Sequence, residues 1–176
     1  MRTSKLLLIL YIMLFATTLF GQENDNNWSK WTWLIGEWTG EGQGQPGQGT
    51  GKFSFQTDLD GTILVRKAFS EYPATKDRAA FVHNDLMIIY KNESGLPNKA
   101  IYFDNENHVI NYSVQMAEES IVFLSTKAPN MPVFRLTYTL IETGKVNIKF
   151  EMSVDGLNFK TYIEGKSVKQ NLNTSK

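Results

Sequence analysis

The alternation that decides the fold is clearest in residues 146–154, which read VNIKFEMSV. Every even-numbered residue of this run is apolar and every odd-numbered residue is polar. Successive side chains of a strand point to opposite faces of its sheet, so the run predicts a strand with one buried and one solvated face. The run 134–140 has the same alternation, with an aromatic-rich apolar face.

Turn signals separate many such runs along the chain. Asp60-Gly61, Thr143-Gly144 and Asp155-Gly156 are examples, and glycine at these places supplies the positive φ that tight hairpins require. The predicted strands cover residues 33–43, 51–58, 62–72, 82–91, 98–104, 107–115, 119–126, 132–141, 145–154 and 157–167. Short connections between ten strands predict an all-β fold, a single up-and-down antiparallel β-barrel, with an open sandwich as the alternative.

The first residues, 1–21, have the pattern of a signal peptide. Arg2 and Lys5 precede an apolar run from Leu6 to Phe20. That run is shorter than the ~20 residues of a membrane span, although a retained anchor is the alternative. We therefore expect a periplasmic or secreted protein, with the barrel domain at 22–170, no membrane span after signal removal, and a disordered tail at 171–176.

Charge and cysteine content narrow the function classes. The chain has 18 basic and 18 acidic residues, and removal of Arg2 and Lys5 leaves a slight acidic excess. Without a basic stripe, nucleic acid is not an expected partner. The absence of cysteine excludes disulfides and a lipoprotein anchor, so stability has to come from packing and sheet closure.

Glycines are concentrated in residues 36–51, GEWTGEGQGQPGQGTG, which hold seven of the thirteen in the chain. Residues 42–47 satisfy G-x-G-x-x-G, but the alternating run that follows predicts a strand, whereas a phosphate site of this type needs a helix. The glycines are instead expected to bend the strand or admit a close neighbour, and 44–51 to form a mobile loop.

Gly36-Glu37-Trp38 resembles the G-x-W signature of the calycins, the group of lipocalins and fatty-acid-binding proteins. The longer glycine ladder from Gly36 to Gly44 is similar to the first strand of nitrobindins, ten-stranded barrels that bind haem, and to exported bacterial lipocalin-like domains. The resemblance implies a calycin-like barrel with Trp38 closing one end.

The up-and-down order assigns each connection to one end of the barrel. We call the end where the first strand begins the Trp end and the opposite end the loop end. The longer connections, 44–50, 73–81 and 128–131, gather at the loop end, which is therefore the expected opening. The candidate ligand-binding residues are the rim residues His83, Asp85, Tyr102, Asp104 and His108, with Arg66 as an internal polar candidate.

Several functions remain open at this stage. His83, Asp85 and His108 have the residue types of a 2-His-1-carboxylate iron site. The nitrobindin resemblance implies haem, but no histidine follows His108 to match that family's late-strand ligand, so His83, His108 or Tyr162 would have to replace it. A glycosidase carboxylate pair also stays open.

A non-catalytic barrel that binds a small hydrophobic or amphipathic molecule is the favoured function, with no cofactor and no catalytic residue assigned. The structural alternative is a packed barrel, because 11 Phe and 7 Tyr could fill a small interior. Arg135 lies opposite the aromatic face of 134–140, and we expect it to be solvated. If that face pointed outward, Arg135 would be a buried cation suited to carboxylates.

Overall fold

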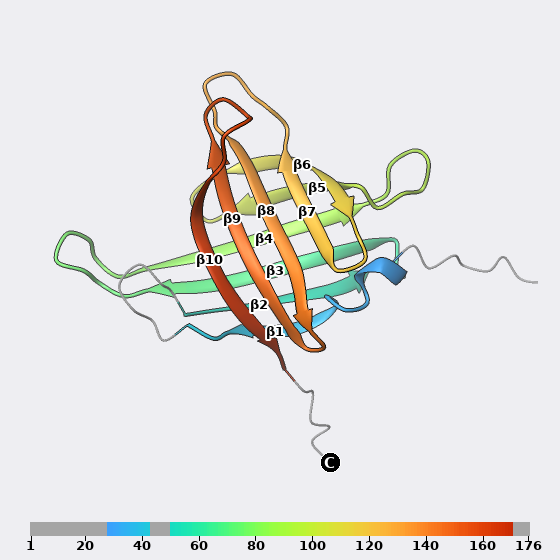
Figure 1. Cartoon of the computed structure of the whole chain (residues 1–176), viewed down its shortest axis with the longest axis horizontal. Coiled ribbons are helices and arrows are strands. Elements are labelled where there is room, and N and C mark those ends of the chain that lie inside the picture. The colour runs from blue at the N-terminus through green and yellow to red at the C-terminus, as the bar shows by residue number, and fades with distance from the viewer. Residues whose placement is uncertain (1–27, 43–49, 171–176) are drawn as a thin grey trace, which may run out of the picture.

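The computed structural model describes residues 28–42 and 50–170, which form one closed antiparallel barrel of ten strands (Figure 1). The strands are β1 (Gly36–Gly40), β2 (Thr50–Asp58), β3 (Ile63–Tyr72), β4 (Phe81–Tyr90), β5 (Lys99–Asp104), β6 (Val109–Met116), β7 (Ser120–Ser125), β8 (Val133–Glu142), β9 (Lys145–Ser153) and β10 (Lys160–Lys169). Each strand pairs with its neighbours in sequence, and β10 pairs with β1. The predicted all-β, up-and-down, ten-stranded barrel is confirmed.

Some predictions concern residues outside the described ranges. The signal peptide 1–21, the tail 171–176 and most of the glycine-rich loop belong to this group. Among the described residues, no helix has the length and apolar character needed to cross a membrane.

The register of β1 fixes which side chains face the interior. Trp38 lies opposite Phe53 on β2 and opposite Lys169 on β10. Directly opposed residues share a face of the sheet, and Trp38 and Phe53 are buried, so this face points inward. The alternation of side chains along each strand then identifies the other inward positions around the barrel. The aromatic-rich face of 134–140 points inward as well, because Leu136 and Tyr138 are buried.

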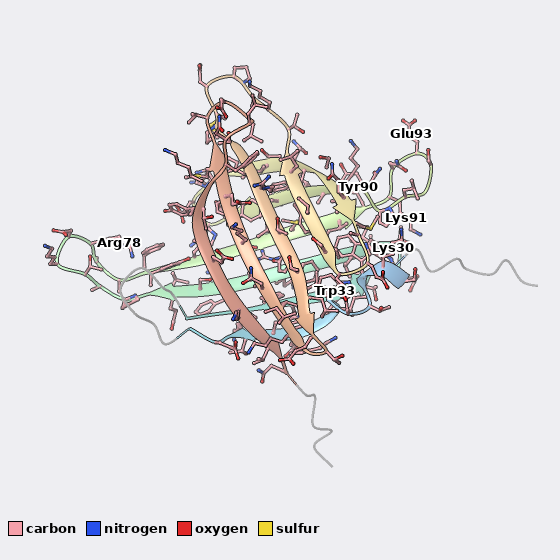
Figure 2. The ribbon with its side chains drawn as sticks, in the orientation of Figure 1. Lys30, Trp33, Arg78, Tyr90, Lys91 and Glu93 are labelled. Carbon is pink, nitrogen blue, oxygen red and sulfur yellow. The ribbon has the colours of Figure 1, made fainter. Side chains whose placement is uncertain are left out.

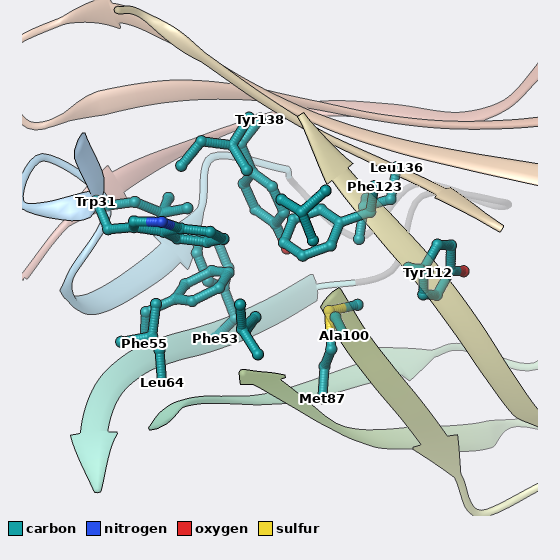
Figure 3. Packing of buried hydrophobic residues seen from close by; sticks show 14 of the residues in the cluster. Trp31, Phe53, Phe55, Leu64, Met87, Ala100, Tyr112, Phe123, Leu136 and Tyr138 are labelled. Atoms are coloured by element: carbon teal, nitrogen blue, oxygen red, sulfur yellow. The ribbon is translucent and has the colours of Figure 1, made fainter. Parts of the chain in front are cut away.

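The core lies between two crossing parts of the barrel, β1–β5 and β7–β10 (Figures 1 and 3). Trp31, Phe55, Phe123 and Tyr138 come from four different elements and are all fully buried. Trp31 lies 6.2 Å from Phe55 and 5.9 Å from Phe123, while Tyr138 lies 5.4 Å from Phe55, measured between ring centroids. Such tilted and edge-to-face contacts add to the stabilisation from area burial. The Trp end of the interior is therefore filled.

The predicted start of the first strand at residue 33 is wrong. A 3-10 helix, Ser29–Trp31, precedes β1, and Trp28 is its N-cap residue. Residues i and i+3 eclipse in a 3-10 helix, which brings the Trp28 and Trp31 rings to 5.8 Å, edge to face. Trp28 Nε1 donates to the Gly61 carbonyl at 2.7 Å and so ties the helix to the β2–β3 turn.

The Trp end is closed by several residues rather than by Trp38 alone. Trp38 is buried, stacks on Phe53 with ring centroids 5.8 Å apart, and donates from Nε1 to the Leu34 carbonyl at 2.8 Å. Trp28, Trp31 and Leu34 are also buried. Figure 2 shows the two ends apart, with Lys30 and Glu93 at the Trp end and Arg78 in the β3–β4 connection of the loop end.

Two inward-facing glycines explain part of the glycine-rich run. A Cβ on Gly51 would lie 2.9 Å from Ser70 Oγ and 3.2 Å from the Phe69 carbonyl oxygen. A Cβ on Gly40 would lie 3.3 Å from the Gly51 carbonyl oxygen. Both residues therefore allow the backbones of β1, β2 and β3 to approach closely. A Cβ on Gly165 of β10, by contrast, would meet nothing within 4 Å.

Gly51→Ala and Gly165→Ala should change stability in opposite directions. We expect Gly51→Ala to lower the free energy of unfolding by about 1 to 3 kcal/mol, because the new methyl group overpacks the β2–β3 contact. Gly165→Ala should raise it by about 0.5 to 1 kcal/mol, because the unfolded chain loses conformational freedom and no contact is strained. Urea denaturation measures both, and equal changes in the two variants would contradict this account.

Candidate functional site

Arg66, the internal polar candidate, faces the interior. On β3 it lies opposite Phe55 of β2 and Met87 of β4, and both of these residues are fully buried. Arg66 itself is only 8% exposed. A buried cation is costly unless it is paired, so its partners determine what it does.

Arg66 connects opposite walls of the barrel. Its Nε donates to Tyr138 Oη on β8 at 2.6 Å, and its Nη1 forms an ion pair with Asp85 on β4. The guanidinium also lies 5.9 Å from the Phe53 ring centroid. Between Arg66 and the Trp end, the interior is packed with apolar and aromatic side chains. Arg66 therefore marks the boundary between that packed half and the loop-end half.

The surroundings of Arg66 and Tyr138 determine the protonation state of each side chain. Burial alone would lower the pKa of Arg66, but the charge of Asp85 and the contact with Tyr138 more than offset it and hold that pKa above its ordinary value. Burial raises the pKa of Tyr138 to about 12, against the opposing effect of Arg66. At neutral pH the site thus contains a charged guanidinium and a protonated phenol.

The polar chain continues from Asp85 toward the loop end through His83. His83 Nε2 lies 3.7 Å from Asp85 Oδ2 and 3.0 Å from Tyr102 Oη, while Nδ1 lies 2.8 Å from Glu106 Oε1. Which nitrogen carries the proton depends on the tautomer. Burial, followed by the charges of Asp85 and Asp104, raises the pKa of Tyr102 well above its ordinary range, so the phenol stays protonated.

Asp104 ends the chain at the β5–β6 turn. It accepts from the Tyr102 hydroxyl at 3.2 Å and lies 2.8 Å from His108 Nδ1, and the backbone N–H groups of Glu106 and His108 donate to it. Burial alone would raise the pKa of Asp104, but these hydrogen bonds hold it below its ordinary value.

The structure brings five of the six predicted ligand-binding residues together around the interior. Arg66, His83, Asp85, Tyr102 and Asp104 form one connected polar chain. The sixth, His108, was predicted to line the rim, and it is attached to this chain because its Nδ1 lies 2.8 Å from Asp104 Oδ2. It lies in the turn before β6, and its side chain is 52% exposed.

Inward positions of the loop-end half carry small side chains on one wall. They are Gly40, Gly51, Ala68, Ser70, Gly165 and Ser167, and they lie on the adjacent strands β10, β1, β2 and β3. Phe134 and Phe150, stacked with centroids 5.8 Å apart, come from β8 and β9. Gly165 and Ile163 are exposed although their register partners Ile148 and Phe150 face inward. Solvent therefore reaches the loop-end half of the interior.

Two hollows lie on the outer face of the barrel. A groove of about 630 Å³ is lined mainly by outward-facing residues of β1–β5, such as Lys52, Phe69 and Phe103. A second, of about 400 Å³, surrounds Arg135 and Glu151. The preferred expectation for Arg135 is confirmed in that it lies on the outer face, where it pairs with Glu151 at 2.7 Å.

The arrangement does not favour metal or haem ligation. Among the described residues, no group of three or more His, Asp or Glu side chains is placed to hold a metal ion, so His83, Asp85 and His108 do not converge on one. Both ring nitrogens of His83 have partners, His108 is in the exposed turn, and Tyr162 is mostly exposed. His83 faces inward, but both of its ring nitrogens are already hydrogen-bonded, so the haem alternative gains no support.

Two residues of the polar chain, Tyr138 and Glu106, were not predicted from the sequence. Tyr138 was assigned to the apolar face of its strand. A buried phenol needs a hydrogen-bond partner, so this residue type already indicated a polar neighbour in the interior. Glu106 lies in the β5–β6 turn, outside every predicted strand, yet its carboxylate lies 2.8 Å from His83 Nδ1. Both contacts join residues far apart in sequence, so strand patterns alone do not reveal them.

Comparisons with known proteins support the fold and leave the family open. No family model matches the chain, and no curated protein matches its sequence. The crystal structure of Rv2717c from M. tuberculosis is similar, with a TM-score of 0.54 and 11% identity over 82% of this chain and 98% of that one. At this identity the likeness concerns the fold alone, and it is consistent with a calycin-like barrel.

Arg66→Met should be far more costly than the matched change on the outer face. It leaves Asp85 buried without its cation, so we expect the free energy of unfolding to fall by about 3 to 5 kcal/mol. Arg135→Met removes a partly exposed ion pair and should cost about 1 kcal/mol. Denaturant titration compares the two, and Arg66→Met/Asp85→Leu should recover part of the loss. Equal costs for the two single variants would contradict the assigned role of Arg66.

Asp104→Asn should remove part of the acid sensitivity of the fold. The pKa of Asp104 is lower in the folded than in the unfolded state, so its stabilisation is present above the unfolded pKa of about 4 and is lost as pH falls through the folded pKa. At neutral pH the variant should be less stable by about 1 to 3 kcal/mol. Unfolding measured at neutral pH and near pH 3 tests this, and an undiminished difference at the lower pH would count against it.

Proposed function

We propose that this chain is a non-catalytic binding protein for a small hydrophobic or amphipathic molecule, held in the loop-end half of the barrel interior. The observation that carries the proposal is the contrast between the two halves. The Trp end is packed with buried aromatic residues, whereas the loop-end half has small residues on one wall and partly exposed inward positions. A packed barrel without ligand space accounts for the Trp-end half, and the contrast with the loop-end half supports a binding site there.

The surroundings of the loop-end half suit a molecule with an apolar body and one polar group. Phe134 and Phe150 offer apolar faces, and burial against them would provide affinity. His83 and Tyr102 belong to the polar chain that begins at Arg66 and Asp85. These two side chains could fix the orientation of a polar group on the ligand. A few placed polar groups within an apolar lining are typical of ligand pockets.

The location of the protein is part of this proposal. Residues 1–21 have the charge and hydropathy pattern of a signal peptide, which supports a periplasmic or secreted protein. A native mass spectrum of the protein from an exporting host would test both points. Extra mass lost on denaturation would identify a bound ligand, and a polypeptide mass matching 22–176 would support cleavage after Gly21.

Gly165→Phe tests the site itself. A side chain at Gly165 enters free space from an inward position, so Phe should occupy the proposed site without disrupting the barrel. Using Nile red as an apolar probe, we expect the affinity of Gly165→Phe to fall by at least about tenfold, because the ring competes for the same apolar volume.

Lys166→Phe is the matched control, since it places the same ring on the outer face of the same strand. Its Nile red affinity should equal that of the unaltered protein, and thermal melting should show both variants folded. If Gly165→Phe binds the probe as tightly as Lys166→Phe does, the site is not in the loop-end half, and the outer groove on β1–β5 becomes the place to search.

A further inference from the structure

Two neighbouring connections at the loop end expose large apolar side chains. Val154 and Leu157, in the β9–β10 connection, are 90% and 83% exposed, and Met131, in the β7–β8 connection, is 47% exposed. Figure 1 shows both connections projecting from the same side of the barrel. We call this feature the apolar tip and define it as residues 126–132 and 154–159.

The apolar tip is held in a defined shape. Asp155 accepts hydrogen bonds from the Ser153 hydroxyl, from the backbone N–H groups of Leu157 and Asn158, and from the Asn158 side chain, all between 2.7 and 2.8 Å. Those contacts, with the Asn158 backbone contributing most, hold the pKa of Asp155 well below its ordinary range. The turn therefore presents Val154 and Leu157 to solvent in a fixed arrangement, without relying on their burial.

The β9–β10 connection lies against the start of β8, which directly follows the β7–β8 connection. Val133 pairs with Ser153 across β8 and β9, and a Cβ on Gly156 would lie 3.6 Å from Val133 Cγ2. The Arg135 guanidinium lies 4.0 Å from the Phe159 ring centroid, which anchors the base of the β9–β10 connection on β8. The exposed side chains thus belong to one surface.

The charges around the apolar tip are mainly basic. Lys127 and Lys160 are exposed, and within the described part of the chain neither forms an ion pair. The one carboxylate of the apolar tip, Asp155, stays ionised within its turn, and nearby Glu151 is paired with Arg135, so Lys127 and Lys160 leave a net positive charge. At the Trp end, Leu59 is 64% exposed but lies between Asp58 and Asp60, so its adjacent residues carry two negative charges and no positive one.

We propose that the apolar tip docks on the surface of an anionic lipid bilayer. Val154, Leu157 and Met131 would enter the boundary between headgroups and acyl chains, and Lys127 and Lys160 would meet the lipid phosphates. A projecting surface of this kind suits a soft, planar partner, and apolar burial combined with basic residues is the usual basis of peripheral binding to anionic lipid. This inference goes beyond the binding of a ligand in the interior, and it would place the loop end toward the lipid.

Vesicle cosedimentation tests the proposal on protein from an exporting host, so that all variants share the same N-terminus. Vesicles of phosphatidylcholine alone are compared with vesicles that also contain phosphatidylglycerol. We expect binding to the anionic vesicles, a loss of about tenfold for Leu157→Asp and a loss of about fivefold for each of Lys127→Gln and Lys160→Gln. Leu59→Asp is the matched control and should leave binding unchanged.

Three results would overturn the proposal. The first is no binding of the unaltered protein to anionic vesicles, and the second is an equal effect of Leu157→Asp and Leu59→Asp. The third is a concentration-dependent self-association that Leu157→Asp abolishes while vesicle binding persists, which would assign the apolar tip to a second copy of the chain. Thermal melting confirms that each variant is folded. Gly165→Phe should dock normally, so failure of the interior site and failure of the apolar tip are distinguishable.

Discussion

Closure of the sheet is the constraint on which the rest of this structure depends. β1 has only five residues, yet it pairs with β2 on one side and with β10 on the other. A shift of one residue in either pairing would turn every inward side chain of that strand outward. Closure therefore fixes the register, and it also removes the exposed sheet edges that a protein without disulfides would otherwise have to protect. The position of every polar group in the interior follows from it.

One consequence is an interior that changes character along its length. The cost of burying the Arg66 charge at the centre is offset because β4 supplies Asp85 and β8 supplies Tyr138, so the group joins three strands from opposite walls. A protein that needed only stability could have filled this position with an apolar residue, and buried ion pairs often stabilise less than such a replacement. The arrangement is easier to understand if the polar chain serves the half of the interior that solvent reaches.

Much of the fold was predictable from the sequence, whereas the site was predictable only in part. Alternation and turn residues predicted ten strands and their order, because period-2 patterning is a local property. The inward face of β4 was not predictable, since His83 and Asp85 share it with Met87 and Ile89 while the other face is also half apolar. The 3-10 helix at Trp28 was missed because three residues are too few to show a period. Contacts such as Arg66 with Tyr138 depend on closure, which no local pattern records.

The contact between the two ends of the barrel domain also bears on how the chain folds. Lys169 donates to the Trp33 carbonyl at 3.3 Å across 136 positions of sequence, and the β1–β10 pairing beside it is equally non-local. Contacts between distant parts of a chain form slowly, because the entropy of a long loop has to be lost first. The barrel cannot close before its last strand has been synthesised, so the nascent chain lacks the closed barrel until β10 is complete. For the exported protein proposed above, this delay would keep the barrel unclosed at the stage when a chain is threaded through a translocation channel.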